Sequence, residues 1–292
     1  RSTRSRSSAA SDVYKRQLQA HFDKLSNSCD ARVAGCLGQV DFVGKPTFAW
    51  QVISEMQLTL PFSYPQVADT VPWGPTANIS FRKDIFLECD GGFDTSMPKY
   101  GGEDVDLGLR LNNAGYVIVT AKAAIAEHTV ETWNSWRQNF RRLWFFGLAD
   151  YYLLIRHPDR AFLDFPTGPI LWLLQLGCGV MLLLLHGLPM FAWVGGGLVL
   201  SILAYHLVYA VVKGQRASRL SVHLLGPLIC YLMDAAKSWE AIRNQKWGLI
   251  FRRLKFLDDL IAQDWPEIAA SAWGISASAL IFFCVVIIGL TF

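Results

Sequence analysis

The sequence lacks charged side chains over long stretches. Asp, Glu, Lys and Arg together make up 17% of its 292 residues, and none of them occurs from residue 165 to residue 212. Hydrophobic residues make up 52%, and the mean hydropathy of +0.26 is high for an ordinary water-soluble domain. The net charge of +3, without an aromatic and basic platform, does not indicate a nucleic-acid-binding protein.

The cysteines lack the spacing of a metal site or a disulfide framework. Six are present, and no two of them form a CxxC pair. Several lie in apolar stretches, so we expect reduced, buried thiols in a reducing compartment.

The first 17 residues lack an apolar core. They are rich in Ser and Arg and have no hydrophobic period, so they do not form a signal peptide. We expect residues 1–17 to be disordered or foreign to the gene.

The uncharged run is long enough to cross a bilayer core twice, since a helix rises about 1.5 Å per residue and the core is about 30 Å thick. A turn at His186–Pro189 divides it. The sequence therefore predicts a transmembrane hairpin over 161–212, with spans at 168–186 and 189–212, and a third span over 268–292.

The segment between these spans, 213–267, combines apolar residues at helical spacing, from Trp239 to Leu257, with several Lys and Arg. This pattern predicts amphipathic helices at a membrane interface; the alternative is a solvated helix packed on a soluble domain. Basic residues flank the hairpin on both sides, so we expect a multi-pass protein of the plasma (inner) membrane with its N-terminal domain in the cytoplasm.

Residues 18–160 have the composition of a globular domain with mixed strands and helices, which predicts an α/β fold. The stretch ARVAGCLGQVDFVG predicts a strand, a short helix begins near Lys83, and a second helix begins at Glu103 and stops at Gly115. YVIVT predicts a strand, and AAIAEHTV predicts another.

Three carboxylates, Glu103, Asp104 and Asp106, open the helix at Glu103. Acidic residues are favourable at any helix N-terminus because of the helix dipole, and Asp106 and Arg110 are spaced for a surface ion pair. The other interpretation is a site: Gly101 and Gly102 let the backbone bring a ligand close, and an ionised carboxylate can accept a proton from a hydroxyl.

The stretch GGFDTSMPKYGGEDVDLGLRLNNAGY, residues 91–116, resembles the acceptor-side segment of family 2 glycosyltransferases, and GPTANISFRKDIF, residues 74–86, resembles their upstream small-residue and basic stretch. The resemblance implies a GT-A (Rossmann-like) fold, of which 18–160 is the C-terminal part. The whole chain is then a partial GT-A domain followed by an α-helical transmembrane region of about three spans.

The resemblance implies an inverting transfer from a nucleotide-sugar donor, with Asp104 as general base and Glu103 beside it. It implies acceptor or donor contacts at Gly91, Gly92 and Asp94. It also implies a divalent ion, Mg²⁺ or Mn²⁺, on the leaving diphosphate. His128 stands where some members carry a metal ligand; a structural role for this strand histidine is the alternative.

RQNFRRLWFFG, residues 137–147, is similar to the QxxRW segment of membrane-integrated synthases. Gln138 and Arg141 fit that pattern, while Arg142 replaces the Trp and Trp144 follows two positions later. Arg141 or Arg142 is expected to bind the diphosphate and Trp144 to stack on an acceptor sugar. A basic interfacial helix is the alternative.

No D-x-D motif precedes the Glu103–Asp104 pair. We therefore expect the chain to be an N-terminally truncated fragment that is inactive alone.

Three functions fit these patterns. The first is a membrane-bound hexosyltransferase-like enzyme of cell-envelope polysaccharide synthesis, which acts on a lipid-linked or glycan acceptor at the lipid bilayer. The second is a processive synthase of the same family. The third is a non-catalytic membrane scaffold or transporter subunit, although the spans contain no charges of the kind that mark many transport paths.

Overall fold

The computed structural model describes residues 2–89, 92–97, 101–163, 168–212, 220–257 and 266–291. Its contacts divide the chain into two compact units. The first unit comprises residues 1–161 and 254–262, and the second comprises 162–253 and 263–292.

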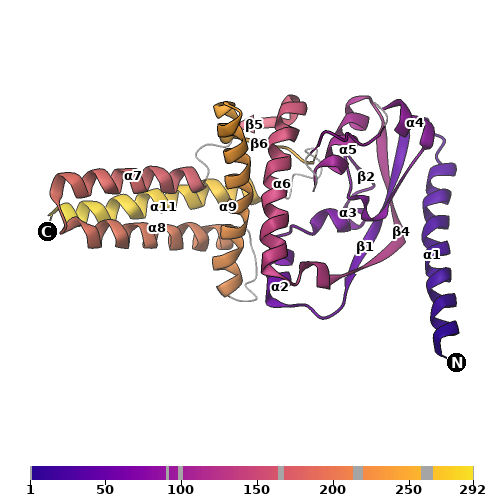
Figure 1. The fold of residues 1–292 in the computed structure, drawn as a ribbon, viewed down its shortest axis with the longest axis horizontal. Coiled ribbons are helices and arrows are strands. Elements are labelled where there is room, and N and C mark those ends of the chain that lie inside the picture. The colour runs from indigo at the N-terminus through magenta and orange to yellow at the C-terminus, as the bar shows by residue number, and fades with distance from the viewer. Residues whose placement is uncertain are drawn as a thin grey trace. The chain divides into compact units, whose positions relative to one another are not determined.

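The first unit is built on a four-stranded sheet with the order β2-β4-β1-β3 (Figure 1). The long strands β1 (Val33–Val43) and β4 (Val117–Thr129) pair in parallel, and the short strands β2 (Thr70–Val71) and β3 (Ile79–Phe81) flank them in antiparallel. The mixed strands and helices confirm the α/β part of the predicted fold.

The parallel pair is irregular at its centre. Gly38 pairs with Ala121, whereas the next residue, Gln39, pairs with Ile125. The side chain of Asn78 fills this break, because its Nδ2 donates to the carbonyl of Gln39 at 2.7 Å and to that of Ala124 at 2.8 Å. The two strands expected around YVIVT and AAIAEHTV are consequently one bulged strand, β4.

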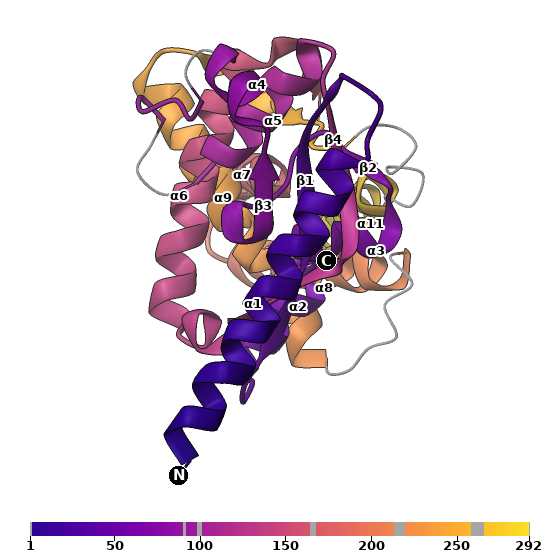
Figure 2. The same ribbon diagram turned by 90° about the vertical axis from the view of Figure 1, so that its right-hand side faces the viewer.

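Helices cover both faces of the sheet. Helix α1 (Ser2–Ser26) crosses one face (Figure 2), where Ala20 and Leu25 pack on a cluster that contains Cys36. Helices α5 (Glu103–Asn113) and α6 (Trp136–Arg156) lie on the other side in Figure 1. Residues 2–17, expected to be disordered or foreign, lie in α1.

Two helices begin where the sequence predicted, α4 at Lys83 and α5 at Glu103. Short elements connect the parts of the fold. They are α2 (Phe48–Glu55), η1 (Leu60–Ser63), α3 (Tyr64–Val67), η2 (Thr76–Asn78), α4 (Lys83–Glu88), η3 (Val130–Trp133), η4 (Pro158–Arg160) and β5 (Ala161–Leu163).

In the second unit three helices pack on one another: α7 (Gly168–His186), α8 (Met190–Val212) and α11 (Pro266–Thr291). Met190, Val194, Phe282 and Val286 form an apolar cluster there, and a polar cluster lies beside it. Gln175, Ser201 and Ser278 meet between the three helices with at most 2% of each residue exposed. The Ser201 hydroxyl donates to the side-chain Oε1 of Gln175 at 2.8 Å, and its oxygen lies 2.6 Å from the hydroxyl oxygen of Ser278. A buried polar group is stable only when it is paired, so this cluster fixes the register of the three helices.

The predicted transmembrane spans are wrong. A span needs about 20 consecutive, predominantly apolar residues. The helices do form at the expected ranges, but in the described part of the chain none combines the length and the apolarity that crossing a membrane requires.

The amphipathic helix expected to continue to Leu257 ends earlier. Helix α9 (Leu220–Arg243) closes at Gln245, whose φ of 57° is left-handed, and the Lys246 N–H donates back to Ala241 O. A 3₁₀ turn and a short strand follow, η5 (Trp247–Phe251) and β6 (Arg252–Leu254).

Candidate functional site

The start of α5 depends on two glycines. Gly101 has a φ of 129° and Gly102, the N-cap, a φ of 91°. A Cβ at Gly101 would lie 2.9 Å from the ring of Phe146, and one at Gly102 would lie 2.9 Å from the Cβ of Ala149. Helix α6 therefore fills the space beside these glycines, where we expected a ligand to come close.

Asp104 is half-buried in the first turn of α5. Its Oδ1 accepts from the Val105 N–H at 2.9 Å, and the backbone at Thr76 donates a further hydrogen bond. Burial and, second, the charge of Glu103 raise the pKa of Asp104 to about 6, although these backbone hydrogen bonds lower it. Near pH 6 this carboxylate is therefore able both to accept and to release a proton.

The loop of residues 72–76 fits closely against α5. A Cβ at Gly108, one turn after Asp104, would lie 2.4 Å from the Cβ of Trp73 and 2.6 Å from its Cα. On the loop's other side, a Cβ at Gly74 would lie 2.6 Å from Leu37 of β1. The loop therefore lies clamped between the sheet and α5.

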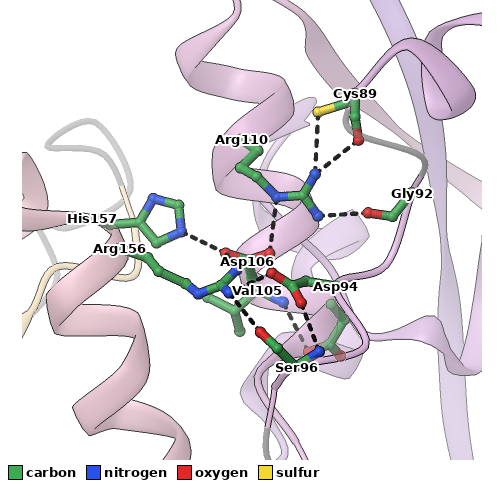
Figure 3. A network of polar contacts seen from close by, with 10 residues as sticks. Cys89, Gly92, Asp94, Ser96, Val105, Asp106, Arg110, Arg156 and His157 are labelled. Atoms are coloured by element: carbon green, nitrogen blue, oxygen red, sulfur yellow. Dashed lines mark hydrogen bonds and ion pairs between the residues drawn. The ribbon is translucent and has the colours of Figure 1, made fainter.

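Asp106, the third acid, is fully buried (Figure 3), where the sequence predicted a surface ion pair. Its Oδ2 accepts from Arg110 Nε at 2.9 Å, and its Oδ1 lies 3.1 Å from His157 Nε2 and 3.4 Å from Arg156 Nη1. Burial by itself raises the pKa of Asp106, but hydrogen bonds from His157 and Arg110 and the nearby guanidinium charges bring it below its ordinary value. This carboxylate is a structural anchor between α5 and the end of α6.

The GGFD turn joins the same network (Figure 3). Arg110 donates to the Gly92 carbonyl at 2.6 Å, and Arg156 pairs with Asp94. Hydrogen bonds from Ser96, and then that from Arg156, lower the pKa of Asp94 to about 2. Gly91 lies outside the described residues.

A cavity of about 280 Å³ opens beside this turn. Because Asp104 and Asp106 are two positions apart on the helix, they point to opposite sides of it. Arg110 and Arg156, which line the cavity, bind Asp106, so the cavity lies on the Asp106 side of the helix. Its lining consists of Phe93, Asp94, Thr95, Arg110 and Arg156.

The candidates on α6 differ in their surroundings. Arg142 stacks over Trp133, 3.7 Å from the ring centre, and donates to the Thr132 carbonyl at 3.1 Å; burial lowers its pKa. Gln138 and Arg141 are exposed. Trp144 is half-buried and, two residues from Phe146, points away from the α6 face that meets Gly101.

His128 is a strand residue near the end of β4. Its ring lies 5.5 Å from that of Phe42, and its Nδ1 lies 3.1 Å from the Thr129 carbonyl. Mg²⁺ and Mn²⁺ need several oxygen ligands. Among the residues whose placement is described, no three His, Cys, Asp or Glu side chains are grouped to hold a metal. The divalent ion therefore stays a prediction.

Sequence reasoning missed Trp73 and His157, which contact α5 from distant parts of the chain. Trp73 directly precedes the GPTAN stretch, and this adjacency is the one signal that marked it.

Comparison with known proteins gives one result. The sequence model of a family described as Glycosyl transferase family group 2 matches residues 19–213, about two thirds of the chain. No curated protein and no solved structure matches the chain.

Proposed function

Because the chain belongs to glycosyl transferase family group 2, we propose that it is an inverting glycosyltransferase with Asp104 as its general base. The family implies a nucleotide-sugar donor and an acceptor. The observation that carries the assignment is the half-buried Asp104 carboxylate, whose pKa of about 6 is close to the working pH expected of a general base.

In the proposed reaction the Asp104 carboxylate takes the proton of an acceptor hydroxyl. The hydroxyl oxygen forms a bond to the anomeric carbon of the sugar, and the bond from that carbon to the diphosphate oxygen breaks. The nucleoside diphosphate leaves with the electron pair, and the configuration inverts. The acceptor hydroxyl belongs to a glycan or a lipid-linked sugar. No step is assigned to a divalent ion.

Glu103 has a supporting part in this proposal. Its negative charge beside Asp104 raises the pKa of that carboxyl, so it makes the base stronger. Where the enzyme works in the cell stays a prediction, since the expected plasma-membrane location depended on the spans.

The test uses the full-length gene product, with UDP-glucose, UDP-N-acetylglucosamine and GDP-mannose as donors and a glycan extract as acceptor. Release of nucleoside diphosphate and labelled product is measured. Asp104→Asn is expected to reduce kcat by about 10²- to 10⁴-fold with an unchanged circular dichroism spectrum. Asp23→Asn, the same change on the exposed part of α1, is the matched control. Wild-type turnover by Asp104→Asn contradicts the proposal. The function of a non-catalytic scaffold would not change with this substitution.

A further inference from the structure

Residues Leu254–Leu257, which we call the strap, belong to the first unit although they follow α9 in the chain. Leu254 and Leu257 are each only 5% exposed. The Lys255 N–H donates to the carbonyl of Arg160 at 2.9 Å. The strap is thus held by apolar burial at both ends and by a backbone hydrogen bond between them.

The strap reaches Trp73 directly. The indole Nε1 of Trp73 donates to the Phe256 carbonyl at 2.9 Å, and the two ring centres are 6.0 Å apart. Tyr64 packs on the Trp73 ring as well, with centres 5.9 Å apart. Trp73 is 7% exposed, so its N–H needs this partner, because a buried donor left unpaired is destabilising.

Trp73 in turn lies against the helix that carries the proposed base. Gly108 and Asp104 are one turn apart, on the same face of α5, and Gly108 has no side chain to separate the helix from Trp73. Three residues after Trp73, the backbone of Thr76 donates to the Asp104 carboxylate. One short loop therefore contacts both the helix and the carboxylate. Because Gly74 has no side chain, this loop packs closely on Leu37.

We propose that Trp73 is a positioning residue for Asp104 and that the strap, through Phe256, holds Trp73 in place. A displacement of the strap moves Trp73, and the loop then withdraws the Thr76 N–H from Asp104. The strap is consequently a built-in control on the base, although it lies 183 residues from Trp73 in the chain. This inference rests on the proposed function of Asp104.

Trp73→Phe and Phe256→Ala in the full chain test the inference. Trp73→Phe keeps a ring but removes the N–H, and Phe256→Ala removes the ring contact. In both we expect kcat to fall by about 10- to 100-fold, as small misplacements of a catalytic group do, with the donor KM changed less than about twofold. The midpoint of the pH–kcat curve should move upward, because the Thr76 hydrogen bond lowers the pKa of Asp104. Trp239→Phe, the same change at an exposed ring of α9, is the control.

A second measurement does not need turnover. In hydrogen exchange followed by mass spectrometry, a peptide that spans residues 74–78 should exchange faster in Phe256→Ala than in the wild type. Unchanged exchange there, or an unmoved kcat and pH midpoint in a folded Trp73→Phe, overturns the inference. If Asp104→Asn keeps its turnover, the proposed function fails instead, whatever the strap variants do.

Discussion

The Nε2 atom of His157 lies 3.1 Å from Oδ1 of Asp106, and both side chains are almost fully buried. This contact fastens the end of α6 to α5 across 51 residues of sequence. Arg110 and Arg156 bind the same carboxylate, so one buried anion holds two guanidinium groups and an imidazole together.

Removal of this anion should be strongly destabilising. In Asp106→Asn the two arginines keep their charges in a partly buried site without the carboxylate. Loss of one partner of a buried pair lowers the free energy of unfolding by about 3–5 kcal/mol, which urea denaturation measures. Asp30→Asn is the control, because the Asp30–Arg32 pair is exposed and its loss should have no measurable effect. Equal effects of the two variants contradict the anchoring role of Asp106.

Local patterns predicted the elements that depend on neighbours in sequence. The alternation around Leu37 predicted β1, and the apolar spacing after Glu103 predicted α5, as observed. The same local logic placed Asp106 on the surface, because an i,i+4 spacing predicts a pair with Arg110 but not that His157 will cover it. The burial of Asp106 depends on the end of α6, 50 residues away in the sequence. The i,i+4 spacing carries no information about that contact.

The site was predictable only where it depends on residues that are neighbours in the sequence. The Glu103–Asp104 pair is a sequence motif, whereas the contact of Trp73 with Phe256 joins residues that nothing in the sequence relates. The apolar runs predicted the ranges of α7 and α8 well. Apolarity is equally compatible with helices that bury one another, so it did not decide what these helices do.

Gly102 should tolerate no side chain. Gly102→Ala places a Cβ 2.9 Å from that of Ala149 and forces a left-handed φ on alanine. Both effects act together, so we expect the free energy of unfolding to fall by about 2–4 kcal/mol. Gly115→Ala is a matched control, since Gly115 has a φ of 87° but nothing within 4 Å of its Cβ position. It should lose only about 1 kcal/mol; a loss as large as that of Gly102→Ala shows that α6 does not press on the helix start.

Cys36 should resist alkylation in the native protein. It is fully buried in the α1 face of the sheet, and burial raises the pKa of its thiol to about 11. The thiolate is the reactive form, so iodoacetamide at pH 8 should label the exposed Cys29 and leave Cys36 unmodified. Peptide mass spectrometry reads both sites, and labelling in denaturant is the control. Equal labelling of the two sites without denaturant excludes the packing of α1 on β1.

Activity should depend on the ionisation of Asp104. The proposed base must be a carboxylate to accept the acceptor proton, and its pKa is raised to about 6. Transfer should therefore increase about tenfold per pH unit below pH 6 and level off above it. Glu103→Gln removes the charge that helps to raise this pKa, so its midpoint should move downward. A midpoint that stays in place in Glu103→Gln means that the titrating group is not Asp104.

Stability should also depend on the ionisation of Asp104, but it should fall as the pH rises, whereas activity should increase. The pKa of Asp104 is about 6 in the folded protein and 3.8 for an ordinary aspartate, so between pH 4 and pH 6 the folded state binds more protons than the unfolded state. The free energy of unfolding therefore falls as the pH rises through this window. Asp104→Asn cannot ionise, so relative to the wild type it should gain about 1–3 kcal/mol between pH 4 and pH 8. Urea titrations of both proteins at the two pH values measure this difference. A variant that loses stability relative to the wild type as the pH rises would show that the folded protein stabilises the Asp104 carboxylate, and a base of raised pKa would then be excluded.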